Sequence, residues 1–280
     1  MKTISKIFLL CCISISAQLS SQAQLQIVSE SNAQVLAQKL AGPGVVITNA
    51  TLVGDPRNTG LFYNRFGSLL NIDSGIVLTN GKAKTPIPPP LPASHTWGVD
   101  ADGFNTASIL NADLSIGLPG DVDLAATIGV PVAETHDACI LEFDFIPQGD
   151  SIKFKYVFSS EEYVPSFVCD FNDAFAFLIS GPGIAGLKNI ALIPNTTTPV
   201  SIFNVNNVPG GACPNNVMYY VDNSSNTYFT HDGHTVTLLA LEKVVPCQTY
   251  HLKLVIADVG DAAYDSGVFL EAGSLTSPAV

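Results

Sequence analysis

Two runs of alternating apolar residues constrain the fold of this chain more than any other feature. The run from Cys139 to Phe145 and the run from Ile152 to Phe158 both place an apolar side chain at every second position. A period of two gives a β-strand one buried face and one wetter face. Because only the short segment 147–150 separates the two runs, we predict a β-hairpin there.

The rest of the chain after Val45 consists of similar short runs rich in Val, Ile, Thr and Phe, separated by Gly, Asn, Asp and Pro. This texture is typical of all-β proteins. Ser31 is predicted to cap one short helix that runs to Leu40. We therefore predict an all-β, antiparallel β-sandwich, jelly-roll-like, with one short N-terminal helix and a single domain over residues 24–280. The additional strands are expected at 45–48, 51–53, 75–79, 174–180, 190–193, 200–204, 219–222, 235–241, 250–257 and 267–272.

Residues 1–23 have the layout of a secretory signal peptide. Lysines precede an apolar run at 7–17, and small or polar residues follow at 21–23. Cys11 and Cys12 lie inside the apolar run rather than at its end, which argues against a lipidated cysteine. No other apolar stretch is long enough to cross a bilayer, so we expect a secreted protein with no transmembrane segment.

The charge balance is strongly acidic. The formal net charge is −12, from 12 basic and 24 acidic residues. Removing residues 1–23 removes two lysines and no acids, which leaves 10 − 24 = −14. Nucleic acid is therefore an unsuitable partner. The acidity is compatible with a divalent cation, although an exported surface explains it equally well.

Four cysteines follow the signal peptide: Cys139, Cys169, Cys213 and Cys247. In an oxidising compartment an even number predicts two disulfides, with three possible connectivities. We favour Cys139 with Cys247, because each begins an alternating run and the two could link neighbouring strands. Cys169 with Cys213 would then tie two loops together.

Two acidic loops lack a neighbouring basic residue. The first follows the run that ends near Phe158, and the second is the segment 258–265. Crowded carboxylates repel one another unless a cation joins them, and oxygen ligands suit Ca²⁺ better than zinc or copper. We therefore predict calcium between these loops, although acids that are simply solvated are the competing interpretation. The candidate ligands are Glu161, Glu162, Asp173, Asp258, Asp261 and Asp265.

The same acids allow a catalytic interpretation. A glycosidase-like hydrolase needs two carboxylates that flank the scissile bond, and Glu161 with Asp258 or Asp265 would be the pair. His231 and His234 have a spacing that some metal sites use, but an exposed turn explains it as well.

Several longer motifs carry a family resemblance: IDSGIVLTNGKA, ACILEFDFIPQGD, FKYVFSSEEY, FNDAFAFLISGPG, NIALIP and CQTYHLKLVIADVGDAAYDSGVFLEAGS. Over residues 32–274 the chain resembles the choice-of-anchor L domain of secreted Bacteroidetes proteins. The resemblance implies export, commonly type IX secretion to the cell surface or medium, and an extracellular module joined to varied anchors. It supplies no catalytic residues. No sorting or anchoring domain follows before Val280, so the resemblance leaves the mode of attachment open.

Together these features predict a secreted, disulfide-stapled binding module, extracellular or at the outer cell surface, whose loops calcium orders. Its expected role is adhesion through a glycan or protein ligand. The alternatives are a hydrolase with a carboxylate pair and a structural spacer that has no ligand.

Overall fold

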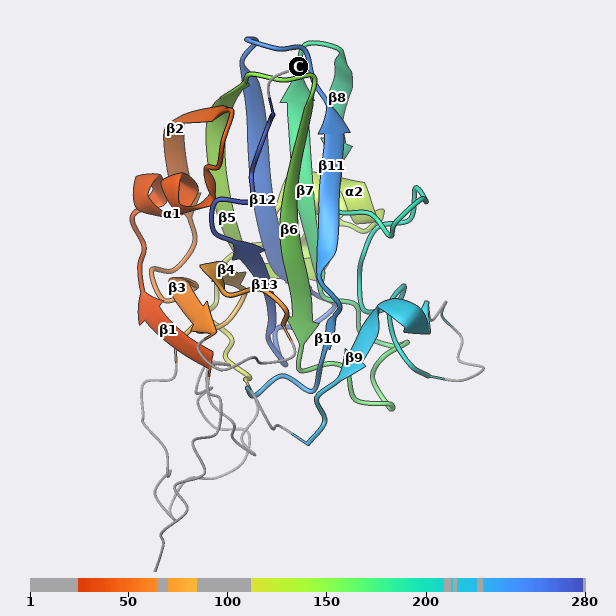
Figure 1. Ribbon diagram of the computed structural model, residues 1–280. Coiled ribbons are helices and arrows are strands. Elements are labelled where there is room, and N and C mark those ends of the chain that lie inside the picture. Colours follow the sequence, from red (N-terminus) through yellow and green to blue (C-terminus); the bar gives the residue numbers. More distant parts are fainter. Residues whose placement is uncertain are drawn as a thin grey trace, which may run out of the picture.

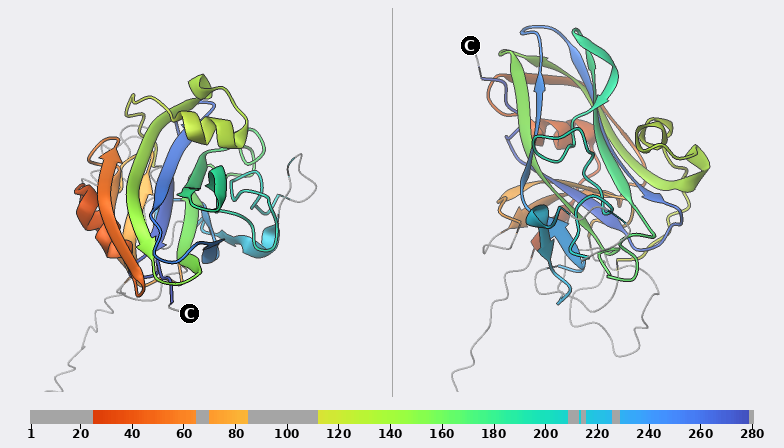
Figure 2. Two further views of the ribbon diagram at one scale, coloured as in Figure 1. Left: turned by 90° about the horizontal axis from the view of Figure 1, so that it is seen from above. Right: turned by 90° about the vertical axis from the view of Figure 1, so that its right-hand side faces the viewer.

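Two antiparallel β-sheets packed face to face form the protein (Figures 1 and 2). This confirms the predicted all-β sandwich. The predicted signal peptide lies outside the residues that the computed structural model describes. The described residues are 25–64, 70–84, 112–208, 213, 216–225 and 229–278.

The larger sheet has the order β1-β3-β4-β13-β6-β10-β9, and β11 also pairs with β6. Its strands are β1 (Leu25–Ser29), β3 (Thr59–Asn64), β4 (Ser74–Thr79), β6 (Ser151–Ser160), β9 (Tyr220–Asp222), β10 (Gly233–Thr235), β11 (Leu238–Lys243) and β13 (Ser266–Glu271).

The smaller sheet has the order β2-β5-β12-β7-β8. Its strands are β2 (Val45–Val53), β5 (Thr135–Pro147), β7 (Ala174–Gly181), β8 (Ile184–Asn189) and β12 (Tyr250–Val259).

Aromatic side chains from facing strands fill the space between the sheets. On β6, Phe154 and Phe158 are buried while Lys155 between them is exposed, as the alternation predicts. Phe154 packs against Phe177 of β7 with ring centroids 5.0 Å apart, and Phe158 stacks on Phe175 at 4.9 Å. These rings fix the two layers face to face and so fix where the ends of their strands meet.

Helix α1 (Ala33–Leu40) is the predicted short helix, but its N-cap is Asn32 rather than Ser31. The Asn32 side chain accepts a hydrogen bond from the Val35 amide at 3.1 Å. Leu36 and Leu40 are buried in the sandwich core, so α1 packs beside β2 at the open side between the two sheets (Figure 2).

Helix α2 (Val122–Ile128) was not predicted. It lies on the outer face of the smaller sheet, next to β7 (Figure 2). Lys253 of β12 reaches it and contacts Asp121 at 2.6 Å and Asp123 at 2.7 Å. Short 3-10 helices lie at Val132–Glu134 and Val217–Tyr219.

The predicted hairpin between the two alternating runs is wrong. Strand β5 pairs with β2 and β12, whereas β6 pairs with β10, β11 and β13. The segment after Pro147 therefore carries the chain from one sheet to the other. Alternation identifies the buried face of a strand, and both layers of a sandwich present such a face to the same core.

Other strand boundaries differ locally. The segments 45–48 and 51–53 belong to one strand, β2, interrupted at Asn49, which has a φ of 55°. The segments 190–193 and 200–204 contribute isolated bridges, Leu192 to Pro199 and Ala174 to Ser201, instead of strands. The segment 235–241 divides between β10 and β11, and β1, β3 and β8 were not predicted.

Candidate cation site

The acidic loops predicted to meet do meet at one end of the sandwich, at the bottom of Figure 1. In the larger sheet Ser266 lies opposite Ser160, and in the smaller sheet Ala257 lies opposite Ala174. The acids that follow or precede these positions therefore converge from both layers. They are Glu161, Glu162, Asp173, Asp258 and Asp265.

All five of these carboxylates are buried, with at most 2% of each residue exposed. Burial is the main cause of their raised pKa values, and their charged neighbours add to it because those neighbours are also acids. The pKa of Glu162 rises to about 10 and that of Asp173 to about 7, while those of Glu161, Asp258 and Asp265 are well above the usual range. Such a cluster needs positive charge or protons.

Asn80, at the end of β4, organises one half of the cluster. Its Nδ2 donates hydrogen bonds to Asp173 at 2.9 Å and to Asp258 at 2.5 Å. Its Oδ1 accepts the Ser266 amide at 2.7 Å, and the Ser266 hydroxyl donates to Asp173 at 2.8 Å. Because Val259 also donates its amide to Asp173 at 3.1 Å, both oxygens of Asp173 are satisfied.

Glu161 and Asp265 form the other half of the cluster. The Glu161 amide donates to the Asp265 carbonyl at 3.1 Å, and the Leu114 amide donates to the Asp265 carboxylate at 3.1 Å. A Cβ atom on Gly81 would lie 1.7 Å from Asp265 Oδ2. Glycine at this position is thus what allows the carboxylate to lie against the backbone.

Three buried carboxylate oxygens in the cluster have no hydrogen-bond partner: Glu161 Oε2, Asp258 Oδ2 and Asp265 Oδ2. Buried polar atoms are normally satisfied, and a protonated acid would need an acceptor for its proton. A cation would satisfy these oxygens directly.

The ligands of such a cation would be mixed. Within the described part of the chain, no three His, Cys, Asp or Glu side chains form a group that could hold a metal ion. An ion here would therefore have fewer than three carboxylate ligands and would complete its shell with amide, hydroxyl or carbonyl oxygens or water. Ca²⁺ accepts that mixture, since it takes six to eight oxygens in flexible geometry.

The predicted ligands Asp261 and Glu162 are placed differently from the others. Asp261 is partly exposed, and its carboxylate accepts the Ala263 amide of its own loop at 3.2 Å. Glu162 is buried, and its Oε2 accepts the Asp173 amide at 3.2 Å. Asp261 raises the pKa of Asp173 and Glu162 raises that of Asp258, but neither contributes one of the three unpartnered oxygens.

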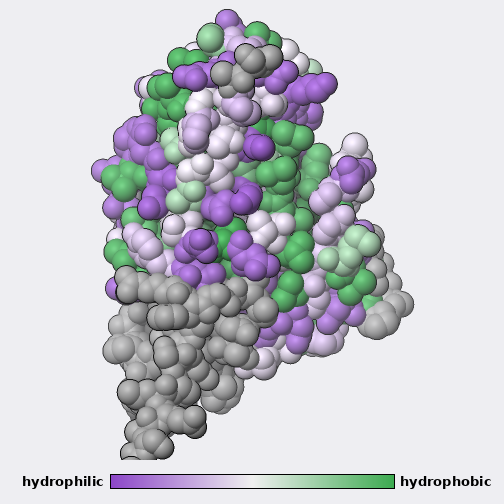
Figure 3. Space-filling model, in the orientation of Figure 1, coloured by the Kyte–Doolittle hydropathy of each residue, from purple (hydrophilic) through white to green (hydrophobic). Residues whose placement is uncertain are grey.

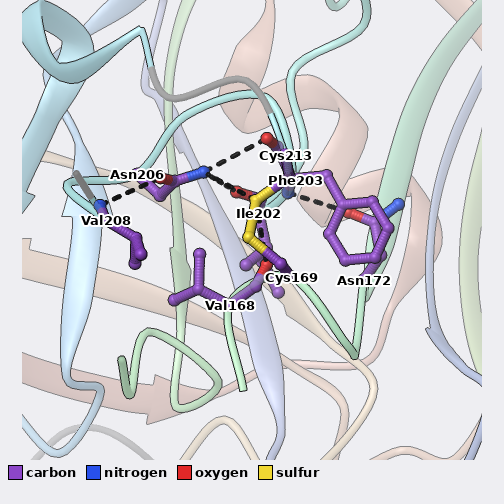
Figure 4. Close-up of a disulfide and its surroundings, with 8 residues drawn as sticks. All are labelled: Val168, Cys169, Asn172, Ile202, Phe203, Asn206, Val208 and Cys213. Atoms are coloured by element: carbon purple, nitrogen blue, oxygen red, sulfur yellow. Dashed lines mark hydrogen bonds between the residues drawn. A yellow bond between two sulfur atoms is a disulfide. The ribbon is translucent and has the colours of Figure 1, made fainter. Parts of the chain in front are cut away.

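The Cys169–Cys213 disulfide is present as predicted, with the two Cα atoms 5.5 Å apart (Figure 4). Cys169 lies on the loop between Glu162 and Asp173, so the disulfide ties that loop to the segment around Cys213. Nearby, the Phe203 amide donates to Asn172 at 3.0 Å (Figure 4). The covalent link therefore restrains a loop that carries two of the acids at its ends.

The predicted Cys139–Cys247 disulfide is wrong, because both thiols are free. Cys139 lies opposite Ile256 inside the smaller sheet, whereas the Cys247 amide donates to Pro147 at the far end of β5. Cys139 and Pro147 are eight residues apart on one strand, about 26 Å at 3.3 Å per residue, which is far beyond disulfide reach.

His231 and His234 are buried rather than exposed. The Nδ1 atom of His231 lies 2.9 Å from the Ser159 hydroxyl, and that of His234 lies 2.8 Å from the Thr235 carbonyl. Burial lowers their pKa values to about 3 and about 4, so both are neutral at physiological pH. They belong to the packing beside Phe229.

Partly exposed aromatic rings lie beside the acidic loops. Phe167 is 5.8 Å from Phe171 and 5.3 Å from Tyr264 between ring centroids. Tyr264 has a φ of 62°, an uncommon conformation for a bulky residue, and its amide donates to Asp113 at 3.3 Å. We call Phe167, Phe171 and Tyr264 the aromatic rim.

Fold and site together define a disulfide-linked β-sandwich module with a buried acidic cluster at one end. The family model of the choice-of-anchor L domain matches residues 24–276, and the chain belongs to this family. Membership indicates an extracellular or surface protein. No curated protein and no solved structure matches the chain. Among the described helices, none has the length and apolar character needed to span a membrane.

Proposed function

We propose that the protein is a secreted binding module whose acidic loop end is ordered by Ca²⁺. One observation carries the proposal: five buried carboxylates meet at the loop end, the charges that raise their pKa values come from other acids, and three of their oxygens lack a partner. Transfer of each ionised carboxylate from water costs several kcal/mol unless an opposite charge accompanies it. A divalent ion would supply that charge, and the three unpartnered oxygens are the ligands that we assign to it.

The aromatic rim is the surface that we assign to ligand contact. Tyr264 stands between Asp261 and Asp265, and Phe167 lies on the loop between Glu162 and Asp173. An ion that orders these loops therefore also positions the rings. Flat rings beside carboxylates suit a glycan, whose apolar ring faces can stack while its hydroxyl groups donate hydrogen bonds. Adhesion through a glycan or protein ligand is the role that we propose for this surface.

The hydrolase alternative receives no support from the geometry. Glu161, Asp258 and Asp265 are at most 2% exposed. A general acid must come within hydrogen-bond reach of the bond that it protonates. A glycosidic bond cannot approach carboxylates that are buried to this extent without opening of the loops.

Thermal unfolding in Ca²⁺ and in chelator tests the ion. A ligand that binds only the folded state at 100 times its Kd stabilises it by about 2.7 kcal/mol, which corresponds to an increase in Tm of about 5–10 °C for a domain of this size. Asp258→Asn should lose this increase yet be at least as stable as wild type in chelator, because it removes a buried charge.

Asp170→Asn provides the matched control, since Asp170 is an exposed acid on the same loop and the variant should keep the full increase. An unchanged Tm between Ca²⁺ and chelator for the wild-type chain would contradict the calcium proposal. A glycan array probed in Ca²⁺, with Tyr264→Ala as the comparison, tests the contact surface separately. Equal glycan binding by the wild-type chain and by Tyr264→Ala would exclude the aromatic rim as the contact surface.

A further inference from the structure

We propose that the aromatic rim binds a glycan whose sugars carry protonated amino groups, and that the carboxylate of Asp170 contacts the ammonium group. The inference rests on the proposed ligand contact at this rim and narrows the ligand to one class of glycan. It does not depend on a bound ion. The positive charge on the amine is what separates such a glycan from neutral and acidic ones.

One coiled segment places an aromatic pair and a carboxylate side by side. The Phe171 amide donates to the Phe167 carbonyl at 3.0 Å, and the Asp170 amide donates to the same carbonyl at 2.7 Å. Hydrogen bonds across four and three residues are those of a helical turn. Residues three and four apart on such a turn are neighbours, with Cβ atoms about 5–6 Å apart. A sugar ring stacked on Phe167 therefore has Asp170 within reach of its substituents.

Tyr264 extends this aromatic surface from the second acidic loop. The ring centroid of Phe167 lies 5.3 Å from that of Tyr264 and 5.8 Å from that of Phe171. Rings at these separations are in direct contact, so an ammonium group cannot be enclosed between them. The rim therefore offers the outer faces of its rings. Such faces suit the flat apolar face of a sugar better than a lone cation such as a lysine side chain.

Asp170 is the acid that a ligand can reach. It is exposed, and no hydrogen bond or ion pair joins its carboxylate to a described residue. The other acids beside the rim are engaged within the protein. Asp261 accepts the Ala263 amide at 3.2 Å, and Asp113 accepts the Tyr264 amide at 3.3 Å. A carboxylate on the surface without a protein partner can accept hydrogen bonds from an ammonium group of a ligand.

The charge around the rim favours a positive ligand. The segments that form the rim and its flanks, 112–114, 160–174 and 258–266, contain no Lys or Arg. Lys82, near the end of β4, acts on Asp55 in a different loop. An ammonium group beside Asp170 would also be attracted by the negative faces of the aromatic rings. Sugars with carboxylate or sulfate groups would be repelled by the same surface.

Two oligosaccharides that differ in charge alone test the inference. Oligomers of glucosamine and of N-acetylglucosamine with equal length and linkage differ only in whether the amino group is free. We expect calorimetric titration of the purified chain at mildly acidic pH to show about fivefold tighter binding of the glucosamine oligomer. This preference should shrink as NaCl is added, because the contact is exposed.

Variants at the rim assign the preference to particular side chains. Asp170→Asn should remove the preference and leave the binding of the N-acetylglucosamine oligomer unchanged. Asp150→Asn is the matched control and should keep the preference, since Asp150 is an exposed acid in the turn between β5 and β6 and the net charge changes equally. Phe167→Ala should weaken the binding of both oligomers, because both stack on its ring.

The possible outcomes separate the inference from the proposed function. Equal or tighter binding of the N-acetylglucosamine oligomer would overturn the inference, and its loss in Phe167→Ala would still leave the rim as the contact surface. An equal loss of preference in Asp170→Asn and Asp150→Asn would overturn it too, because net charge alone would then be the cause.

Two further results would also overturn the inference. Tighter binding of a lysine oligomer than of the glucosamine oligomer would indicate a protein ligand in place of a glycan. Binding of neither sugar oligomer by the wild-type chain would exclude an amino-sugar ligand. The calcium proposal is judged separately, by the thermal unfolding of the same chain in Ca²⁺ and in chelator.

Discussion

Within the part of the chain that the structure describes, two cysteines carry free thiols in contrasting surroundings. Cys139 is fully buried in β5, and burial raises the pKa of its thiol to about 12. Cys247 is exposed. Only a thiolate that solvent can reach is alkylated quickly, so the two residues should differ sharply in reactivity.

Iodoacetamide should therefore add one group to the native chain without residues 1–23, at Cys247, and a second at Cys139 only after addition of denaturant. Peptide mass spectrometry distinguishes the two positions. Cys247→Ser is the control and should remain unlabelled while folded. Labelling of native Cys139 at the rate of Cys247 would show that β5 is not buried as described.

Single residues also show why the site was only partly predictable. The acids were found because charge without a counter-charge is visible in a sequence. Asn80 and Ser266 were missed, because a neutral amide and a hydroxyl become ligand-like only when folding places them among carboxylates. Asn80 also precedes Gly81, a pair that is typical of an ordinary turn.

At the level of elements, the start of α1 gives a measurable distinction between adjacent residues. Asn32 caps the helix through the Val35 amide, while Ser31 precedes the cap. Loss of an N-cap side chain costs about 1 kcal/mol. Because Leu36 and Leu40 anchor this helix in the core, that cost should appear in the stability of the whole domain.

Asn32→Ala should lower the free energy of unfolding by about 1 kcal/mol in urea denaturation, whereas Asn32→Ser should lower it by much less. Ser31→Ala is the matched control and should leave it almost unchanged. A larger loss of unfolding free energy for Ser31→Ala than for Asn32→Ala would place the N-cap at Ser31, as the sequence analysis predicted.

Helices and strands that have a local sequence pattern could be predicted, whereas those that depend on contacts with distant residues could not. The alternation in β5 and β6 predicted two strands but could not assign them to layers. Helix α2 is short, and its cap residue Asp121 is paired with Lys253, 132 residues further along the chain. No window of sequence around α2 contains that interaction.

For the molecule as a whole, the net charge of −12 means that any salt can stabilise the fold by screening. This general effect has to be distinguished from the effect of a bound Ca²⁺ ion. Exposed acids are screened by any electrolyte over about 8–10 Å, but buried acids are screened much less. NaCl at the ionic strength of the Ca²⁺ solution should therefore raise Tm far less than Ca²⁺ does. Equal increases in differential scanning calorimetry would indicate general screening in place of a bound ion.

The outer surface combines charged residues with apolar ones. Figure 3 shows hydrophobic residues gathered along β11, where Leu239 and Leu241 are exposed. Lys188 of β8 pairs with Glu242 of β11 at 2.6 Å, so a charge pair joins edge strands of opposite sheets. A charged pair on sheet edges disfavours pairing with a further strand.

The acidic cluster draws on both layers: Glu161 and Asp265 adjoin strands of the larger sheet, and Asp173 and Asp258 adjoin or belong to strands of the smaller one. At the opposite end the layers are joined by the turn after Pro147 and by bonds such as that from Gly149 to Ser277. The acidic end is joined by the chain as well, because the loops 161–173 and 260–265 each lead from a strand of one sheet to a strand of the other. Under the calcium proposal, these two crossings would slacken when the ion leaves, so the tension that the module withstands would follow the calcium concentration around it.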